Sequence, residues 1–235
     1  MGAHDGGRCV RVGALHVPFG TARDWVTTYV AGDGAGDRAS AYPAYDAYRA
    51  DRRGDPLDEA DLLAPVLLNV WRLSLDAYTW MVAQLPALNR ALADIPLAAD
   101  LANTPEDDVT RRLGSLFSVL DAQDRHGVRL TILSKVLHRK RPGFIPLWDV
   151  NVGKCYTAEL SRDLARRADR PYADFAGVVA GAVRQDLQEG EVAWKELAAL
   201  APGVRVTPLR ALDMVAWTLG HATGWACDPE QHPQA

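Results

Sequence analysis

The sequence is short of the patterns that mark exported and disulfide-bonded proteins. It has three cysteines, Cys9, Cys155 and Cys227, which are far apart and include no Cys-x-x-Cys pair. An odd number of widely separated cysteines does not make a disulfide framework and is typical of a reducing compartment. The N-terminus, MGAHDGGRCV, lacks the charged and then apolar order of a secretory signal. We therefore expect a cytoplasmic protein.

Long apolar runs and clustered metal ligands are also missing. No run reaches the roughly 18 apolar residues that a membrane-spanning helix requires. The longest candidate, between Leu57 and Leu75, is interrupted by several polar residues. None of the six histidines lies three or four residues from another histidine or a cysteine, the spacing that places two ligands on one helix face. The sequence therefore predicts no membrane partner, no metal site and no cofactor, and it carries no pattern that fixes an oligomeric state.

The composition of 48% hydrophobic and 24% charged residues is that of an ordinary globular protein. Proline, capping residues and apolar periodicity predict helices over most of the chain. Residues 8–17 alternate loosely and favour a strand or an extended arm. We expect a mainly helical fold with one domain over 1–225, an arm or strand within 1–20, and a frayed tail over 226–235. Helices are predicted at 21–31, from Pro56 with a kink or split at Pro65, at 74–85, from Thr104-Pro105 to about Asp121, and at 128–141, 150–168, 172–189, 191–200 and from Thr207-Pro208.

The charge is distributed unevenly along the chain. The net charge is −4, but the stretch from Arg125 to Arg141 has six Lys or Arg residues and no acid. We call residues 125–141 the basic strip. An acidic protein with one basic strip differs from a uniformly basic nucleic-acid binder. The strip predicts contact with phosphate, with an acidic partner or with the acidic remainder of the chain.

The most chemically dense segment runs from Ser134 to Asp149, SKVLHRKRPGFIPLWD. In a helix over 128–141, Lys135, His138 and Arg139 are spaced by three and four residues, so they share the face opposite the apolar stripe. Pro142-Gly143 then reverses the chain, and an apolar link leads to Asp149, which occupies the N-cap position of the next helix. The reversal predicts that Lys135 and Asp149 lie close together.

Such a pair suits acid–base or covalent chemistry. A capping aspartate has a fixed backbone, and its free oxygen can activate water or stabilise a developing cation. Lys135 can act as a nucleophile or hold a phosphate, and His138 can transfer protons or contact a phosphate. The structural alternatives are that Asp149 is only a cap, that 139–141 is a solvated turn, and that Phe144 and Trp148 belong to the core rather than to a base-stacking surface.

The string KVLHRKRPGFIPLWD, with DLLAPVLLN at 61–69 and LRALDMVAW at 209–217, resembles an uncharacterised actinobacterial family of unknown function. It is also distantly similar to the helix-hairpin-helix DNA glycosylases, in which a lysine-bearing helix, a short link and a helix-opening aspartate follow a hairpin. This resemblance implies a glycosylase-like helical fold, catalytic roles for Lys135 and Asp149, and extrusion of a base from DNA. The chain departs from the pattern in two ways: only Gly127 marks the hairpin, and the separation from Lys135 to Asp149 is shorter by about one helical turn.

Three functions follow as hypotheses. The first is a DNA-repair-like N-glycosylase, or an inactive relative of one, that binds phosphates through the basic strip at Arg129, His138, Arg139, Lys140 and Arg141. The second is a non-catalytic module that binds nucleic acid or nucleotides, and the third is a helical protein-interaction domain. For the glycosylase, Trp148 lies next to Asp149 in the sequence, and Asp213 and Trp217 lie on one side of the last predicted helix. We expect these three residues to line the same cleft, while a local ion pair between Arg210 and Asp213 is the structural alternative.

Overall fold

The computed structural model describes residues 8–32, 41–70, 73–156 and 170–222. The second half of the predicted helix at 150–168 and the whole predicted tail at 226–235 lie outside these ranges. In the described part the fold is mainly helical with a short two-stranded sheet near the N-terminus, as the sequence predicts. The elements are β1 (Cys9–Val12), β2 (Leu15–Pro18), α1 (Phe19–Ala31), α2 (Ala44–Ala47), η1 (Ala50–Arg52), η2 (Asp61–Leu68), α3 (Leu75–Ala93), α4 (Glu106–Phe117), η3 (Ser118–Asp121), α5 (Leu130–His138), α6 (Val150–Tyr156), α8 (Tyr172–Glu189), α9 (Glu191–Ala198) and α10 (Pro208–Ala222).

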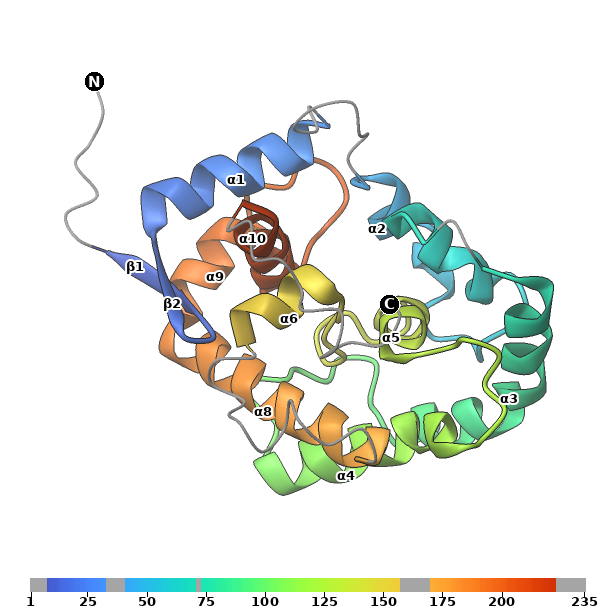
Figure 1. The fold of residues 1–235 in the computed structure, drawn as a ribbon. Helices are drawn as coiled ribbons and strands as arrows, with labels where there is room; N and C mark the ends of the chain where they lie inside the picture. The colour runs from blue at the N-terminus through green and yellow to red at the C-terminus, as the bar shows by residue number, and fades with distance from the viewer. Residues whose placement is uncertain (1–7, 33–40, 71–72, 157–169, 223–235) are drawn as a thin grey trace.

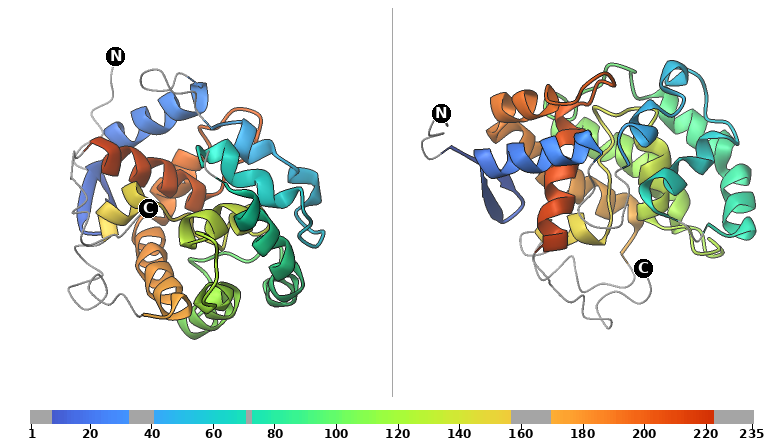
Figure 2. Two further views of the ribbon diagram at one scale, coloured as in Figure 1. Left: turned by 45° about the vertical axis from the view of Figure 1, so that its right-hand side comes forward. Right: turned by 90° about the horizontal axis from the view of Figure 1, so that it is seen from above.

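Helix α5 lies between two groups of elements (Figure 1). On one side are α1, α6, α9 and α10, and on the other are α2, η2 and α3. Helices α4 and α8 pack along each other, as Figures 1 and 2 show. Helix α5 contacts η2, and α6 contacts α10. Segments that are far apart in the sequence therefore meet around α5.

The N-terminal hairpin is anchored on α6 and α8 by its turn. Strands β1 and β2 are antiparallel, with Val12 opposite Leu15. At the turn, Gly13 has a φ of 59° and donates its N–H to Asp186 Oδ2 at 2.7 Å. A Cβ at this position would lie 2.2 Å from the carbonyl oxygen of Cys155. Glycine is therefore required here both by the left-handed backbone and by the close contact.

Most predicted helix starts are confirmed. Ser74 accepts the N–H of Ala77 and caps α3, and prolines precede or begin α4, α8 and α10. The helix predicted from Pro56 is wrong in type, because the chain forms the 3₁₀ helix η2 over Asp61–Leu68 with Pro65 inside it. Proline has no N–H to donate to the residue four positions earlier, and its ring crowds that carbonyl, which disfavours a continuous α-helix.

The larger of two apolar clusters in the described ranges extends from the β1 residue Val10 to the α10 residue Ala216. It includes the predicted α5 stripe of Leu130, Leu133 and Leu137. The small residues of α8 permit close packing, since a Cβ at Gly177 would come within 3.1 Å of Thr110 on α4. Within the described ranges, no helix combines the length and the apolar character that crossing a bilayer demands.

Candidate functional site

Two α5 side chains form hydrogen bonds that help to hold the reversal between α5 and α6. The Ser134 hydroxyl accepts the N–H of Trp148 at 3.2 Å. Nδ1 of His138 lies 2.7 Å from the carbonyl oxygen of Ile145. Because a carbonyl only accepts, Nδ1 carries the proton and donates it. Burial lowers the pKa of His138 to about 3, so the ring is neutral at physiological pH and serves as a brace between helix and link.

Asp149 combines the two roles that the sequence left open. Its Oδ1 accepts the backbone N–H groups of Asn151 at 2.9 Å and Val152 at 3.1 Å, so it caps α6. Its Oδ2 lies 3.8 Å from Nζ of Lys135. No hydrogen bond to Oδ2 is present among the described residues. The capping prediction is confirmed, and the cap uses only one of the two carboxylate oxygens.

Lys135 enters this site from the last turns of α5. Its side chain is largely buried, and Nζ donates to the carbonyl oxygen of Leu68, at the end of η2, at 3.3 Å. Burial lowers the pKa of the ammonium group, and the Asp149 and Asp213 carboxylates partly offset this effect. The predicted proximity of Lys135 and Asp149 is therefore confirmed, in an environment that favours the neutral amine more than water does.

Arg210 of α10 is fully buried and holds two carboxylates. Its Nε and Nη2 donate to the two oxygens of Asp46 at 3.0 and 3.2 Å, and Nη2 also donates to the Tyr29 hydroxyl at 3.0 Å. Its Nη1 donates to Oδ2 of Asp213. The predicted pair between Arg210 and Asp213 is present, but it is buried rather than exposed. The sequence did not predict Asp46 as a partner, because the two residues are 164 positions apart.

Asp213 is linked electrostatically to the pair of Lys135 and Asp149. Burial raises the pKa of Asp213 to about 6; the charges of Arg210 and Lys135 lower it, and Asp149 raises it. The side chains of Lys135, Asp149 and Asp213 are 8%, 17% and 11% exposed, respectively. The three groups are therefore mostly desolvated, but each remains partly accessible to solvent. A carboxyl group that titrates near neutrality in such surroundings is typical of a functional site.

The C-terminal part of the basic strip faces the protein interior. Arg139 donates to the carbonyl oxygens of Asp46 and Tyr48, and Arg141 donates to four backbone carbonyls. Nζ of Lys140 lies 2.8 Å from the Asp61 carboxylate. The prediction of a solvated turn at 139–141 is wrong, because backbone carbonyls and an internal carboxylate take up these cations. A phosphate would have to displace these bonds to reach them.

The other predicted residues lie around this region in different settings. Phe144 is fully buried, and Trp148 packs edge-on against Phe175 with ring centroids 5.4 Å apart. Trp217 is partly buried and stacks on His221 at 5.3 Å, on the same helix as Asp213. Arg129 is half-buried and immediately precedes α5. The structure thus pairs Lys135 with Asp149, and Asp213 interacts electrostatically with both; for Phe144, the core interpretation is confirmed.

The predicted hairpin before α5 is a tight turn. The N–H of Val128 donates to the carbonyl oxygen of Arg125 at 2.9 Å. Between them, His126 and Gly127 have φ values of 49° and 82°. Both central residues are therefore left-handed, although only one of them is glycine.

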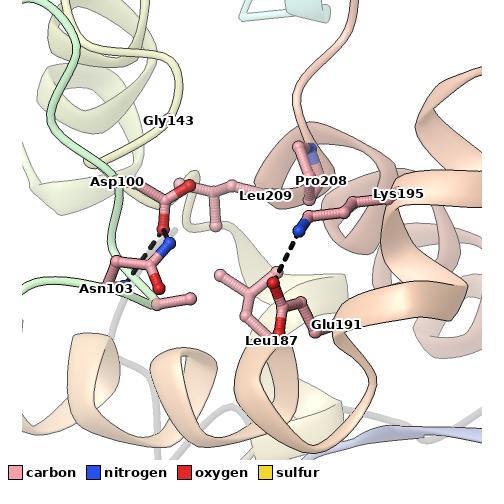
Figure 3. A pocket seen from close by; sticks show the side chains of 9 residues that line it. Asp100, Asn103, Gly143, Leu187, Glu191, Lys195, Pro208 and Leu209 are labelled. Atoms are coloured by element: carbon pink, nitrogen blue, oxygen red, sulfur yellow. Dashed lines mark hydrogen bonds and ion pairs between the residues drawn. The ribbon is translucent and has the colours of Figure 1, made fainter.

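A pocket elsewhere in the molecule shares none of these residues (Figure 3). It has an empty volume of about 350 Å³, part of it open to solvent, and lies between the 100–103 segment, α9 and the start of α10. Its polar walls are an Asp100–Asn103 hydrogen bond and a Glu191–Lys195 ion pair, all exposed. These groups satisfy one another in solvent, so the pocket offers no activated group. Across the described ranges, no three His, Cys, Asp or Glu side chains form a group that could hold a metal ion.

Comparison with known proteins gives a family for this chain. The model of a family of unknown function (DUF6308) matches residues 22–220. The chain belongs to this family. The matched region contains Lys135, Asp149, Asp213 and the elements that position them. No curated protein and no solved structure matches the chain.

Proposed function

We propose that this member of the family is an N-glycosylase, a hydrolase of the bond between a sugar and a nitrogenous base, with its reactive centre at Asp149 and Lys135. The observation that carries the proposal is the 3.8 Å separation between Asp149 Oδ2 and Lys135 Nζ. Lys135 precedes and Asp149 follows the chain reversal that the hydrogen bond between Ser134 and Trp148 holds. Asp149 caps α6 through Oδ1, so its Oδ2 takes no part in the capping hydrogen bonds. The resemblance to helix-hairpin-helix DNA glycosylases supports the same assignment of roles.

Cleavage of an N-glycosidic bond develops positive charge on the sugar, and Oδ2 of Asp149 is the group available to stabilise it. At an effective dielectric constant of about 20, a carboxylate roughly 4 Å from a unit positive charge contributes about 4 kcal/mol. That free energy corresponds to a rate factor of roughly 10³. The same oxygen can orient the attacking water, and the Lys135 amine faces the sugar from the other side.

DNA is the first substrate to test. The test measures base release, in single-turnover reactions, from duplexes that each carry one damaged or mismatched base. The Asp149→Asn variant keeps a capping oxygen but loses the charge, so we expect its rate to fall by roughly 10³-fold. Borohydride added during the reaction should trap a covalent adduct if the Lys135 amine attacks the sugar, and Lys135→Gln should abolish that adduct.

A matched control is available at Asp121. It accepts the N–H groups of Tyr172 and Ala173 at the start of α8, but it is exposed and is not part of the Lys135 site. Asp121→Asn should therefore leave the rate unchanged. Equal rates for the Asp149→Asn variant and the wild type would contradict the role of Asp149. The absence of base release by the wild type from every duplex would contradict the proposed function itself.

A further inference from the structure

We propose that Asp213 is a second catalytic carboxyl group, which protonates the leaving base while Asp149 stabilises the sugar cation. This inference rests on the proposed function and deepens it. It assigns a class of substrate: bases that are neutral in the substrate and leave poorly unless they receive a proton.

The packing of α6 against α10 brings Asp213 to the site. Cys155 Sγ lies 3.3 Å from the carbonyl oxygen of Ala216, and Lys154 Nζ donates to that of Gly220 at 3.1 Å. These contacts pack the start of α6 against α10 near Gly220, and Asp213 lies about two turns earlier on α10. Arg210, which binds Asp213, lies 5.4 Å from the ring centroid of Tyr45, and the Tyr45 hydroxyl donates to the carbonyl of Lys135 at 2.7 Å. Lys135 acts electrostatically on both carboxylates. Lys135 of α5 thus pairs with Asp149 at the start of α6, and Arg210 and Tyr45 connect this pair to Asp213 of α10.

Asp213 has one oxygen bound and one available. Oδ2 accepts from Arg210, whereas Oδ1 has no hydrogen bond among the residues that the structure describes. The side chain keeps 11% of its surface exposed, so a substrate atom can reach it. In Asp149, likewise, Oδ1 is hydrogen-bonded by the cap of α6, and Oδ2 accepts no hydrogen bond among the described residues. Such a carboxyl group is held in place by one oxygen and can exchange a proton through the other.

Burial favours a proton on Asp213 near neutrality, although the cations around it oppose this effect. Arg210 and Lys135 face it as cations and Asp149 as an anion, and the Tyr29 and Tyr45 hydroxyl groups also interact with its charge. Arg210 also donates two hydrogen bonds to Asp46, so its positive charge is shared between two carboxylates. Arg210 therefore stabilises the Asp213 carboxylate less than it would alone. Burial is the largest influence and raises the pKa of Asp213 to about 6.

The proposed step is balanced with water as the only co-reactant. The bond between the sugar C1 and the base nitrogen breaks, and its electron pair stays on the base. The base takes the proton of the Asp213 carboxyl group, which becomes a carboxylate. Water adds to the C1 cation beside Asp149 and releases a proton, which restores the Asp213 acid through the solvent. The pair matches the pattern in which two carboxyl groups with different environments act as acid and as charge stabiliser.

The experiment compares two leaving groups in the full-length protein. One duplex carries a mismatched, neutral adenine; the other carries 7-methylguanine, whose ring is already cationic and needs no proton to leave. In single-turnover reactions, Asp213→Asn should lose about 10²-fold or more on adenine, the usual worth of general acid catalysis. The same variant should lose less than about threefold on 7-methylguanine, and this retained activity shows that it is folded.

The wild-type pH profile gives a second test that needs no variant. Because the acid form of Asp213 is the active form, the adenine rate should fall about tenfold per pH unit above about 6. The 7-methylguanine rate should not show this fall. Equal losses on both duplexes, parallel pH profiles, or release of 7-methylguanine alone would overturn the role of Asp213 while the proposed function stands. Release of neither base by the wild type would overturn both.

Discussion

Mild acid should destabilise this protein through His138. The ring is buried, its Nδ1 donates to the carbonyl of Ile145, and burial lowers its pKa from 6.5 to about 3. In the unfolded chain, the His138 ring therefore takes up a proton as the pH falls below 6.5. In the folded chain, the ring stays neutral down to about pH 3. The stabilising contribution of the neutral ring is fully present above 6.5 and is lost as the pH falls towards 3.

The size of this effect follows from the linkage relation. Each pKa unit corresponds to about 1.4 kcal/mol, so the free energy of unfolding should fall by about 2 kcal/mol between pH 7.5 and pH 5 from this residue. The full effect approaches roughly 4 to 5 kcal/mol near pH 3. These values are large beside the roughly 5–15 kcal/mol by which a domain is stable. The raised pKa of Asp213 acts in the opposite direction over the same pH range, so a variant without the titrating ring is needed to isolate the contribution of His138.

Urea unfolding at pH 7.5 and at pH 5, followed by circular dichroism, measures the effect. The Asn side chain of a His138→Asn variant carries an N–H donor close to the position of Nδ1 but does not titrate. We expect the variant to be less stable than the wild type at pH 7.5, because a smaller side chain faces Tyr45, yet to lose about 2 kcal/mol less on acidification. His16→Asn, on the exposed edge of β2, is the control and should leave the pH dependence unchanged. Identical pH dependence in the wild type and the His138→Asn variant would refute the reasoning.

Three further predictions concern stability and are measured by urea or thermal unfolding. Lys140→Met should destabilise the fold by about 3 kcal/mol, because it removes a fully buried partner of Asp61. Gly220→Ala should cost several kcal/mol, since its Cβ would lie 2.0 Å from the carbonyl oxygen of Asn151; Gly181→Ala, which meets nothing within 4 Å, is the matched control and should be neutral or stabilise by up to about 1 kcal/mol. Ser134→Ala should cost about 1 to 2 kcal/mol, because it leaves the Trp148 N–H without its acceptor, and should also slow base release by loosening Asp149. Equal stability of any of these three variants and the wild type would contradict the corresponding contact.

Local features of the fold were predictable from the sequence because local chemistry determines them. Prolines mark the starts of α4, α8 and α10, and Ser74 caps α3. The proximity of Lys135 and Asp149 was predictable for the same reason: one helix, one Pro-Gly reversal and one cap separate them. Where a proline lies inside an apolar pattern, as at Pro65, the pattern alone does not separate an α-helix from a 3₁₀ helix.

The partners of the buried cations were not predictable, because most of them are backbone carbonyl groups. A run such as Arg139-Lys140-Arg141 is usually solvated, and every residue type carries the same carbonyl, so no residue pattern reveals these acceptors. The link between Asp46 and Arg210 spans 164 positions and depends on how α2 lies against α10. For Asp213, the sequence therefore shows only its helical spacing from Arg210 and Trp217. Its buried environment depends on tertiary packing, which the sequence pattern does not reveal.

The basic strip and the candidate site are parts of one buried network that passes through Asp46. Arg139 binds the backbone carbonyl of Asp46, while Arg210 binds its carboxylate. Arg139 thus fixes the residue that holds Arg210, and Arg210 in turn holds Asp213. The Tyr45 hydroxyl closes the network by donating to the carbonyl of Lys135 at 2.7 Å. The cations that seemed suited to an external phosphate therefore act within the protein, where they fix the positions of the groups that surround Asp149.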